Sequence, residues 1–234
     1  MLKACLNGGR RRDDHNAVPV TPAELAADAA RCAASGVAAV HVHPRDTAGV
    51  ESLDPTVIAE AVTAIRVARP DLPVGVSTGA WIAPDPAARV AAVRAWTVLP
   101  DFASVNAHEP GAAAVAAALH ERGVMVEAGL WTEAAVDAWR RWSVPTGRIL
   151  VECMAEEPDV ALSDAAAILA ALPAGGPPVL LHGEGAATWS VLAEAVRRGL
   201  DTRIGLEDSL VLPDGSVAPD NVALVAAARA LGAT

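Results

Sequence analysis

The sequence predicts an α/β protein with the (β/α)8 TIM-barrel fold. Short apolar segments of strand length alternate with longer Ala-rich segments of helical period, and the pair repeats eight times along the 234-residue chain. Eight strand–helix units in about 250 residues are typical of this barrel. No linker interrupts the pattern, so residues 1–234 are expected to form one domain.

The apolar segments define the expected strands, and each is followed by an expected helix. The expected strands are Lys3–Asn7, Ala38–His43, Pro73–Ser77, Phe102–Asn106, Val124–Glu127, Ile149–Glu152, Val179–His182 and Arg203–Glu207. The expected helices are Pro22–Ala34, Pro55–Ala68, Pro86–Trp96, Ala112–Arg122, Thr132–Trp142, Ser163–Leu172, Thr188–Arg198 and Pro219–Leu231.

Several helix boundaries carry local signals. Thr21-Pro22 and Asp54-Pro55 each place a capping side chain before a proline at the first helical position. Ser35-Gly36, Arg122-Gly123 and Arg198-Gly199 provide glycines where helices are expected to end. An open doubly wound sheet is the alternative fold, but it more often has about five to seven strands and a GxGxxG motif after the first.

Composition excludes several classes of function. The chain has 28 acidic and 18 basic residues and a formal net charge of -10, which disfavours binding to nucleic acid or to an anionic membrane. The expected partner is a small molecule or another protein. Lys3 is the only lysine and lies at the start of the first expected strand, so Schiff-base and pyridoxal phosphate chemistry are nearly excluded.

The three cysteines, Cys5, Cys32 and Cys153, are far apart and form no CxxC pair, so neither a disulfide framework nor a thiolate zinc site is indicated. The N-terminal residues contain no signal-peptide apolar region, and no apolar stretch reaches the roughly 18 residues of a membrane span. A soluble, cytoplasmic protein is therefore expected.

Polar residues gather where the expected strands end, which is where TIM barrels place their chemistry. These residues are Asn7, His41, His43, Ser77, Thr78, Ser104, Asn106, Glu127, Glu152, His182, Glu207 and Asp208. Burying so many polar groups is unfavourable unless they bind a ligand or one another. The carboxyl ends of the strands are therefore the expected active site.

The sharpest motif is His41-Val42-His43 on the second expected strand. Residues at i and i+2 of a strand point to the same face, so both imidazoles can reach one cation. Barrel closure brings Glu207 to the same rim, which gives a His, His, carboxylate set suited to zinc or to another divalent ion. A structural role for the histidines is the alternative interpretation.

Three weaker motifs surround it. Gly75-Val76-Ser77-Thr78-Gly79 matches GxSxG, but a loop rather than a helix follows, so Ser77 is expected to contact substrate or to be a turn serine. His182-Gly183-Glu184-Gly185 follows the seventh strand, where barrels often bind phosphate. Arg10-Arg11-Arg12 is a candidate anion site, although Asp13-Asp14 follow and favour a solvated loop.

Taken together, these motifs resemble the β-keto acid cleavage enzyme family over nearly the whole chain. The resemblance rests on Asn7-Gly8, His41-Val42-His43-Pro44-Arg45, Val76-Ser77-Thr78-Gly79, Ser104-Val105-Asn106-Ala107 and Arg203-Ile204-Gly205-Leu206-Glu207-Asp208. The combination of HxHxR with RxGxED is the most specific part.

The resemblance implies a zinc-dependent enzyme with one Zn²⁺ per chain, commonly a homotetramer. It implies the conversion of a β-keto acid and acetyl-CoA, the co-substrate, into acetoacetate and a new acyl-CoA by a retro-Claisen route. It also implies the roles of individual residues. The metal ligands would be His41, His43 and Glu207; the catalytic residues Asp208 as general base, Arg203 and Ser77; and the substrate contacts Ser104, Asn106 and Thr78, to which Glu127 and Glu109 are added as candidates.

The sequence departs from the family at three places. Gly9 stands where the aminohexanoate-cleaving members have a glutamate that faces the substrate amine, and Glu109 is an additional acidic residue. Ala186-Ala187 replace an Arg-Trp pair. Unless Glu109 takes the place of the missing glutamate, a neutral or anionic β-keto acid is the expected substrate, because a buried ammonium group needs a charged partner.

Two other functions remain open. A metal-dependent TIM-barrel hydrolase is one, although amidohydrolases carry HxH on the first strand and not on the second. A non-catalytic metal-binding barrel is the other, although binding alone would require neither Arg203 nor Asp208.

Overall fold

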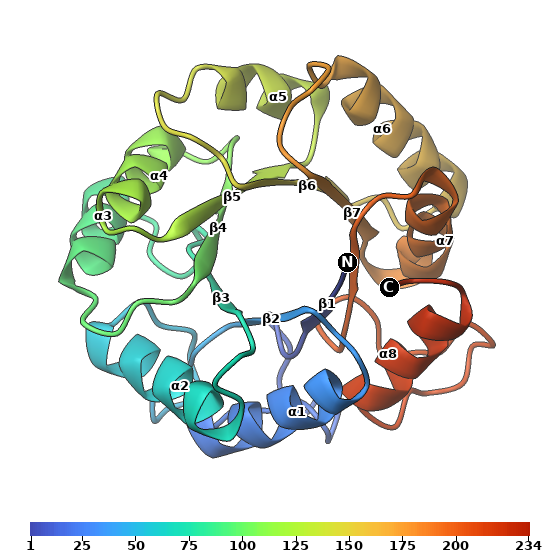
Figure 1. The fold of residues 1–234 in the computed structure, drawn as a ribbon, viewed down its shortest axis with the longest axis horizontal. Helices are drawn as coiled ribbons and strands as arrows, with labels where there is room; N and C mark the ends of the chain where they lie inside the picture. Colours follow the sequence, from blue (N-terminus) through green and yellow to red (C-terminus); the bar gives the residue numbers. More distant parts are fainter.

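The computed structural model describes all residues from Met1 to Thr234, and its eight parallel strands form a single sheet that curves into a barrel (Figure 1). The strand order is β7-β6-β5-β4-β3-β2-β1-β8. The ring is completed between β7 and β8, where Leu181 N donates to Asp201 O at 2.9 Å and Leu180 pairs in parallel with Asp201. The predicted (β/α)8 TIM-barrel fold is confirmed.

The observed elements follow the expected alternation. The strands are β1 (Leu2–Cys5), β2 (Ala39–Val42), β3 (Val74–Ser77), β4 (Phe102–Asn106), β5 (Met125–Leu130), β6 (Arg148–Cys153), β7 (Val179–Gly183) and β8 (Thr202–Ile204). The helices are α1 (Pro22–Ala34), α2 (Pro55–Ala68), α3 (Pro86–Ala95), α4 (Ala112–Glu121), α5 (Glu133–Arg140), α6 (Pro158–Ala171), α7 (Thr188–Arg198) and α8 (Asn221–Ala230), with a short 3-10 helix, η1 (Gly185–Ala187), before α7.

The helix starts that Thr21-Pro22 and Asp54-Pro55 signal are present, whereas α6 begins at Pro158, five residues before the expected start at Ser163. In α1, Thr21 and Glu24 form a reciprocal capping box, and Pro22 occupies the first turn. Asp54 and Asp85 cap α2 and α3 by accepting hydrogen bonds from Thr56 N and Ala87 N. Side-chain caps satisfy backbone N–H groups that have no partner inside the helix, so they fix where the helices begin.

The main core lies between the barrel wall and the surrounding helices. It is built mainly from Val, Leu, Ile and Ala, as the low aromatic content requires. The barrel interior also holds charge, because the fully buried Lys3 Nζ donates to the fully buried Glu127 Oε2 at 2.7 Å. A buried ion pair of this kind requires both partners, since removing one leaves an uncompensated charge.

Only β3 and β4 end where the sequence predicts, and the other strand ends decide which residues reach the rim. Strand β1 ends at Cys5, two residues early, and the ends of β2 and β7 differ by one residue. Strands β5 and β6 extend to Leu130 and Cys153, whereas β8 ends at Ile204. The backbone at Gly205 approaches Cys5 O so closely that an added Cβ would lie 1.8 Å away. The chain then leaves the sheet, and Asn221 Oδ1 accepts from Leu206 N at 2.7 Å. Glu207 is therefore on a loop.

None of the helices has both the length and the apolar character that crossing a membrane would require.

Candidate active site

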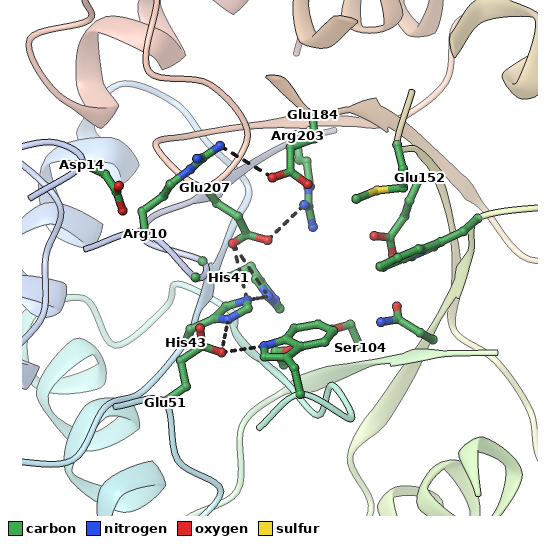
Figure 2. Close-up of a pocket in the computed structure, with 17 residues that line it drawn as sticks. Arg10, Asp14, His41, His43, Glu51, Ser104, Glu152, Glu184, Arg203 and Glu207 are labelled. Carbon is green, nitrogen blue, oxygen red and sulfur yellow. Dashed lines mark hydrogen bonds and ion pairs between the residues drawn. The ribbon is translucent and has the colours of Figure 1, made fainter. Parts of the chain in front are cut away.

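A polar cavity of about 500 Å³ lies at the carboxyl ends of the barrel strands (Figure 2). Of its 17 lining residues only three are hydrophobic: Trp81, Trp131 and Met154. Its charged side chains include the acidic Asp14, Glu51, Glu152, Glu184 and Glu207 and the basic Arg10 and Arg203. The cavity thus carries an excess of acidic groups, which favours occupation by a cation.

Three side chains in this cavity point toward one another, from β2, from the loop after β2 and from the loop after β8 (Figure 2). Nε2 of His41 lies 3.1 Å from Nε2 of His43. Oε2 of Glu207 lies 3.6 Å from the His43 nitrogen and 4.0 Å from the His41 nitrogen. Each residue can offer one ligand atom, and all three atoms lie within 4.8 Å of one another.

The hydrogen bonding of this cluster fits a metal ion. Glu207 Oε2 is buried and accepts no hydrogen bond within the protein. A buried carboxylate oxygen without a partner is unfavourable, and a divalent cation would satisfy it. Two imidazoles and one carboxylate are the donor set of many catalytic zinc sites, in which further coordination positions stay open.

The charges in the cluster also suit cation binding. Burial holds the pKa of His41 well below its usual value, so its imidazole is neutral. Burial opposes ionisation of Glu207, but the Arg203 guanidinium and the His43 ring hold its pKa well below the usual range. For His43, burial is outweighed by the carboxylates of Glu207 and Glu51, which raise its pKa to about 9. A metal ion would therefore displace a proton from His43.

The first loop holds the cluster in place. The Asn7 side chain forms two hydrogen bonds with the His43 backbone, at 2.8 and 2.9 Å. Gly8 has φ +51° and its missing side chain leaves room for Glu207, whose Cγ would lie 2.4 Å from an added Cβ. Arg45 ties this loop to the second one, since its guanidinium donates to the carbonyl oxygens of Gly8, Arg10 and Gly49. The Asn-Gly and HxHxR motifs thus build one structure.

A second carboxylate orients His43 from the far side of its ring. Glu51 Oε2 lies 3.0 Å from His43 Nδ1 and also accepts from Trp81 Nε1 at 2.8 Å. The Trp81 ring stacks on the His43 ring with centroids 6.2 Å apart. Gly79 makes this stacking feasible, because an added Cβ would lie 2.3 Å from the Trp81 ring. Such carboxylate–histidine pairs fix the tautomer of a metal-binding histidine.

Arg203 joins the cluster to Asp208. Its guanidinium contacts Glu207 Oε1 at 3.0 Å and Asp208 Oδ1 at 2.8 Å. Arg203 lines the cavity, whereas Asp208 is fully buried and does not line it. Burial raises the pKa of Asp208 to about 7, and its Oδ2 has no hydrogen-bond partner. A carboxyl group with a pKa near neutrality is suited to general-base catalysis.

Glu152 is a second carboxyl group of this kind, on the opposite wall from Glu207 (Figure 2). Burial raises its pKa to about 7. Its Oε2 lies 3.7 Å from Nε2 of His182, whose pKa burial holds well below the usual value. The His182 ring is therefore neutral, and Glu152 has no cationic partner in direct contact.

The structure brings some of the predicted substrate contacts to the cavity and leaves others outside it. Ser77, Ser104 and Asn106 all line it. The Ser77 hydroxyl also accepts from Gly79 N at 3.3 Å, as expected of a turn serine. Thr78 is fully buried away from the cavity, and its hydroxyl donates to Ser104 O at 2.7 Å. The prediction that Thr78 contacts substrate is therefore not supported by its position.

The prediction for Glu127 is wrong. Its carboxylate is fully buried between Lys3 and Arg148, whose guanidinium lies 2.8 Å from Oε1, and it does not line the cavity. The physical reason is that β5 continues to Leu130, so Glu127 lies below the rim. Glu127 stabilises the barrel interior instead.

Glu109 does not replace the glutamate that is missing at Gly9. It lies outside the cavity lining, where its Oε2 accepts from Arg89 at 2.5 Å and from Ala80 N at 3.0 Å. Its Oε1 accepts from Asn106 Nδ2 at 3.0 Å. Glu109 therefore contacts a cavity residue rather than the cavity.

Two arginines of the first loop, Arg10 and Arg12, point in different directions. Arg10 lines the cavity and lies 3.6 Å from Glu184 of the loop after β7 (Figure 2). Arg12 faces away and pairs with Glu24 of α1. Arg10 is thus the arginine of this group that a ligand in the cavity could meet.

Sequence reasoning missed the roles of Glu51, Trp81, Trp131 and Met154. Glu51 returns to the site through an antiparallel bridge with Arg45, a short hairpin that no sequence period indicates. Trp131 and Met154 directly follow β5 and β6, so correct strand ends would have placed them at the rim.

Comparison with known proteins identifies the family. The sequence matches the family of beta-keto acid cleavage enzymes over residues 1–234. The chain belongs to the β-keto acid cleavage enzyme family. The predicted resemblance is confirmed.

Among solved structures, ObcA has the same fold. Its apo form matches with a TM-score of 0.74 and 17% identity, covering 93% of this chain and 63% of that one. Its complex with oxaloacetate matches with a TM-score of 0.73 and 17% identity, covering 93% of this chain and 64% of that one. Its ternary complex with a C4-CoA adduct and oxalate matches with a TM-score of 0.73 and 16% identity, covering 91% of this chain and 63% of that one. The present chain thus spans less than two thirds of the length of ObcA.

Proposed function

We propose that this protein is a zinc-dependent enzyme that converts a β-keto acid and acetyl-CoA into acetoacetate and a new acyl-CoA. The observation that carries the proposal is the convergence of His41, His43 and Glu207 on one point of a polar cavity, in a chain of this family. ObcA has been solved with oxaloacetate, itself a β-keto acid, and with a CoA adduct. Both ligand classes agree with the proposal.

His41, His43 and Glu207 would hold the metal ion, and zinc bound there would supply a Lewis acid for the substrate oxygens. Ser77, Ser104 and Asn106 line the wall beside the metal-binding cluster. Their hydroxyl and amide groups would hold the keto acid by hydrogen bonds, which orients the carbon between its two carbonyl groups.

Asp208 would be the general base that removes a proton from this carbon. Its pKa of about 7 leaves a large fraction ionised at neutral pH. Arg203 contacts both Asp208 and the cavity, so it would hold the carboxylate and offset negative charge that develops on the substrate. Asp208 is fully buried behind Arg203, so its carboxylate would have to turn past the guanidinium to reach the substrate.

The bonds balance without any further reactant. The deprotonated carbon of the keto acid attacks the thioester carbonyl of acetyl-CoA, and CoA leaves as a thiolate. The thiolate then attacks the original ketone, the bond between that ketone and the central carbon breaks, and acetoacetate leaves with its proton restored. No lysine takes part, which agrees with the position of Lys3 in a buried ion pair.

The test is to incubate the purified, zinc-loaded protein with acetyl-CoA and a panel of β-keto acids and to measure acetoacetate and acyl-CoA. Formation of both products in equal amounts supports the proposal. Consumption of a substrate without any new acyl-CoA would favour a metal-dependent hydrolase instead. The homotetramer that the family implies is also a proposal, which light scattering on the same sample tests.

A further inference from the structure

A buried chain of three side chains runs from α3 to the cavity wall. Arg89 of α3 is fully buried and donates to Glu109 Oε2 at 2.5 Å and to Thr78 O at 3.4 Å. Glu109 Oε1 in turn accepts from Asn106 Nδ2 at 3.0 Å. Asn106 ends β4 and lines the cavity.

This chain determines which end of the Asn106 amide faces a ligand. An ionised carboxylate only accepts hydrogen bonds, so the Asn106 group that faces Glu109 must be its NH₂. Arg89 and Ala80 N both donate to the other carboxylate oxygen of Glu109, so the carboxylate is held as an acceptor on both sides. The amide oxygen of Asn106 must then point away from Glu109, and Asn106 lines the cavity.

A second free acceptor lies beside this oxygen. A Cβ added to Gly129 of β5 would lie 2.3 Å from Asn106 Oδ1 and 2.6 Å from Glu152 Oε1. Both oxygens therefore lie against the backbone of Gly129 and close to one another, an approach that a side chain at this position would prevent, and both residues line the cavity. Asn106 Oδ1 accepts no hydrogen bond from the protein, whereas the Trp131 side chain lies near the Glu152 carboxyl group and lowers its pKa.

We infer that Glu109 is a positioning residue that makes this part of the cavity an acceptor subsite. Asn106 Oδ1 and Glu152 Oε1 select a β-keto acid whose side group carries a hydrogen-bond donor, such as a hydroxyl or an ammonium group. The inference rests on the proposed function for its substrate and adds which side group is preferred. A site with unpaired buried acceptors discriminates against ligands that leave them unpaired.

The test uses β-keto acids that differ only in the terminal group of the side chain: hydroxyl, amino, methyl and methoxy. The terminal hydroxyl and amino groups can donate a hydrogen bond. The methyl group can neither donate nor accept one, and the methoxy group can only accept one. For the parent enzyme we expect kcat/KM to be at least about tenfold higher for the better donor than for the methyl acid, since one hydrogen bond to an unpaired group contributes about 1.4 kcal/mol or more. Comparing kcat/KM for the hydroxyl-substituted and the amino-substituted β-keto acid separates a preference for a neutral donor from a preference for a charged one.

Glu109→Gln provides the decisive variant. Its oxygen remains with Arg89 and Ala80 N, so its NH₂ must face Asn106, whose amide then turns and presents NH₂ to the cavity. We expect the preference to reverse, so that the methoxy acid becomes a better substrate than the hydroxyl acid. Loss of side-chain packing alone would lower all four rates together. Glu121→Gln is the matched control, because Glu121 pairs with Arg94 on the surface, and it should keep the parent's preference.

If Glu109→Gln does not fold, Asn106→Ala replaces it, because removing the oxygen should abolish the preference for donors. A parent enzyme that cleaves β-keto acids without preferring a donor overturns this inference and leaves the proposed function intact. So does a donor preference that persists in Glu109→Gln or Asn106→Ala. A parent that cleaves none of the four acids with acetyl-CoA contradicts the proposed function itself. Zinc content of each variant, measured by elemental analysis, should equal that of the parent.

Discussion

The Nδ1 atom of His43 lies 3.0 Å from Oε2 of Glu51, while Nε2 of the same ring faces His41 and Glu207. This arrangement uses both nitrogens of one imidazole. The carboxylate on one side fixes the ring, and the other side remains available to a cation.

We therefore predict that Glu51→Gln weakens zinc binding by about 10–100-fold, the usual effect of removing a carboxylate that supports a metal-binding histidine. Competition with a fluorescent zinc chelator measures the affinity. His41→Ala with His43→Ala defines the level without a site, and Glu60→Gln, at an exposed position of α2, is the control. Unchanged affinity in Glu51→Gln would refute the role of this carboxylate, and tight zinc binding in the double variant would refute the ligand assignment.

Asp208→Asn should reduce kcat by at least about 10²-fold, because the amide keeps the shape of the side chain but accepts no proton. Zinc content should be unchanged. For the parent, kcat/KM should rise with pH up to about 7, since the base must be ionised and the pKa of Asp208 is about 7. Glu152→Gln tests the other carboxyl group of similar pKa. A larger loss in Glu152→Gln than in Asp208→Asn would show that Glu152 is the base.

The fold and the metal-binding cluster could be predicted from the sequence, because both depend on local patterns. The period of apolar residues predicts eight strand–helix units. The i, i+2 spacing of His41 and His43 predicts that both imidazoles point to the same face of the strand. Barrel closure then brings Glu207 to the same rim.

The remaining parts of the site depend on where each strand stops, and sequence patterns fix strand ends poorly. Glu127 was misplaced because β5 runs three residues further, to Leu130. The contact of Glu109 with Asn106 was missed because its partner Arg89 comes from α3, and no local pattern indicates a buried arginine on that helix.

Lys3→Met should destabilise the metal-free protein by about 3 kcal/mol, because Glu127 would lose one of its two buried cationic partners. Urea denaturation measures the change. Arg94→Met, which breaks an exposed pair with Glu121, should cost less than about 1 kcal/mol. A loss equally small for Lys3→Met would show that the buried pair contributes little. Residual folded Lys3→Met should still bind zinc, since Lys3 takes no part in the chemistry.

The stability of the metal-free protein should depend on pH through Glu152. Burial raises its pKa from 4.5 to about 7, so between these values the folded protein holds a proton that the unfolded chain has released. This contribution to stability is fully present below pH 4.5 and is lost as the pH rises through about 7. Glutamine does not titrate. The stability of Glu152→Gln relative to the parent should therefore increase by roughly 2–3 kcal/mol between pH 5 and pH 8. Denaturation curves at both values measure the difference, and a constant difference would contradict the raised pKa.

The most direct test of the central claim is the fate of the acetyl group of acetyl-CoA labelled with ¹³C at its carbonyl carbon. The proposed reaction joins this acetyl group to the central carbon of the β-keto acid. The label is therefore predicted at C3 of acetoacetate by NMR, and the new acyl-CoA should carry no label. Label that remains in acetyl-CoA or appears as acetate, while the β-keto acid is consumed, would contradict the account.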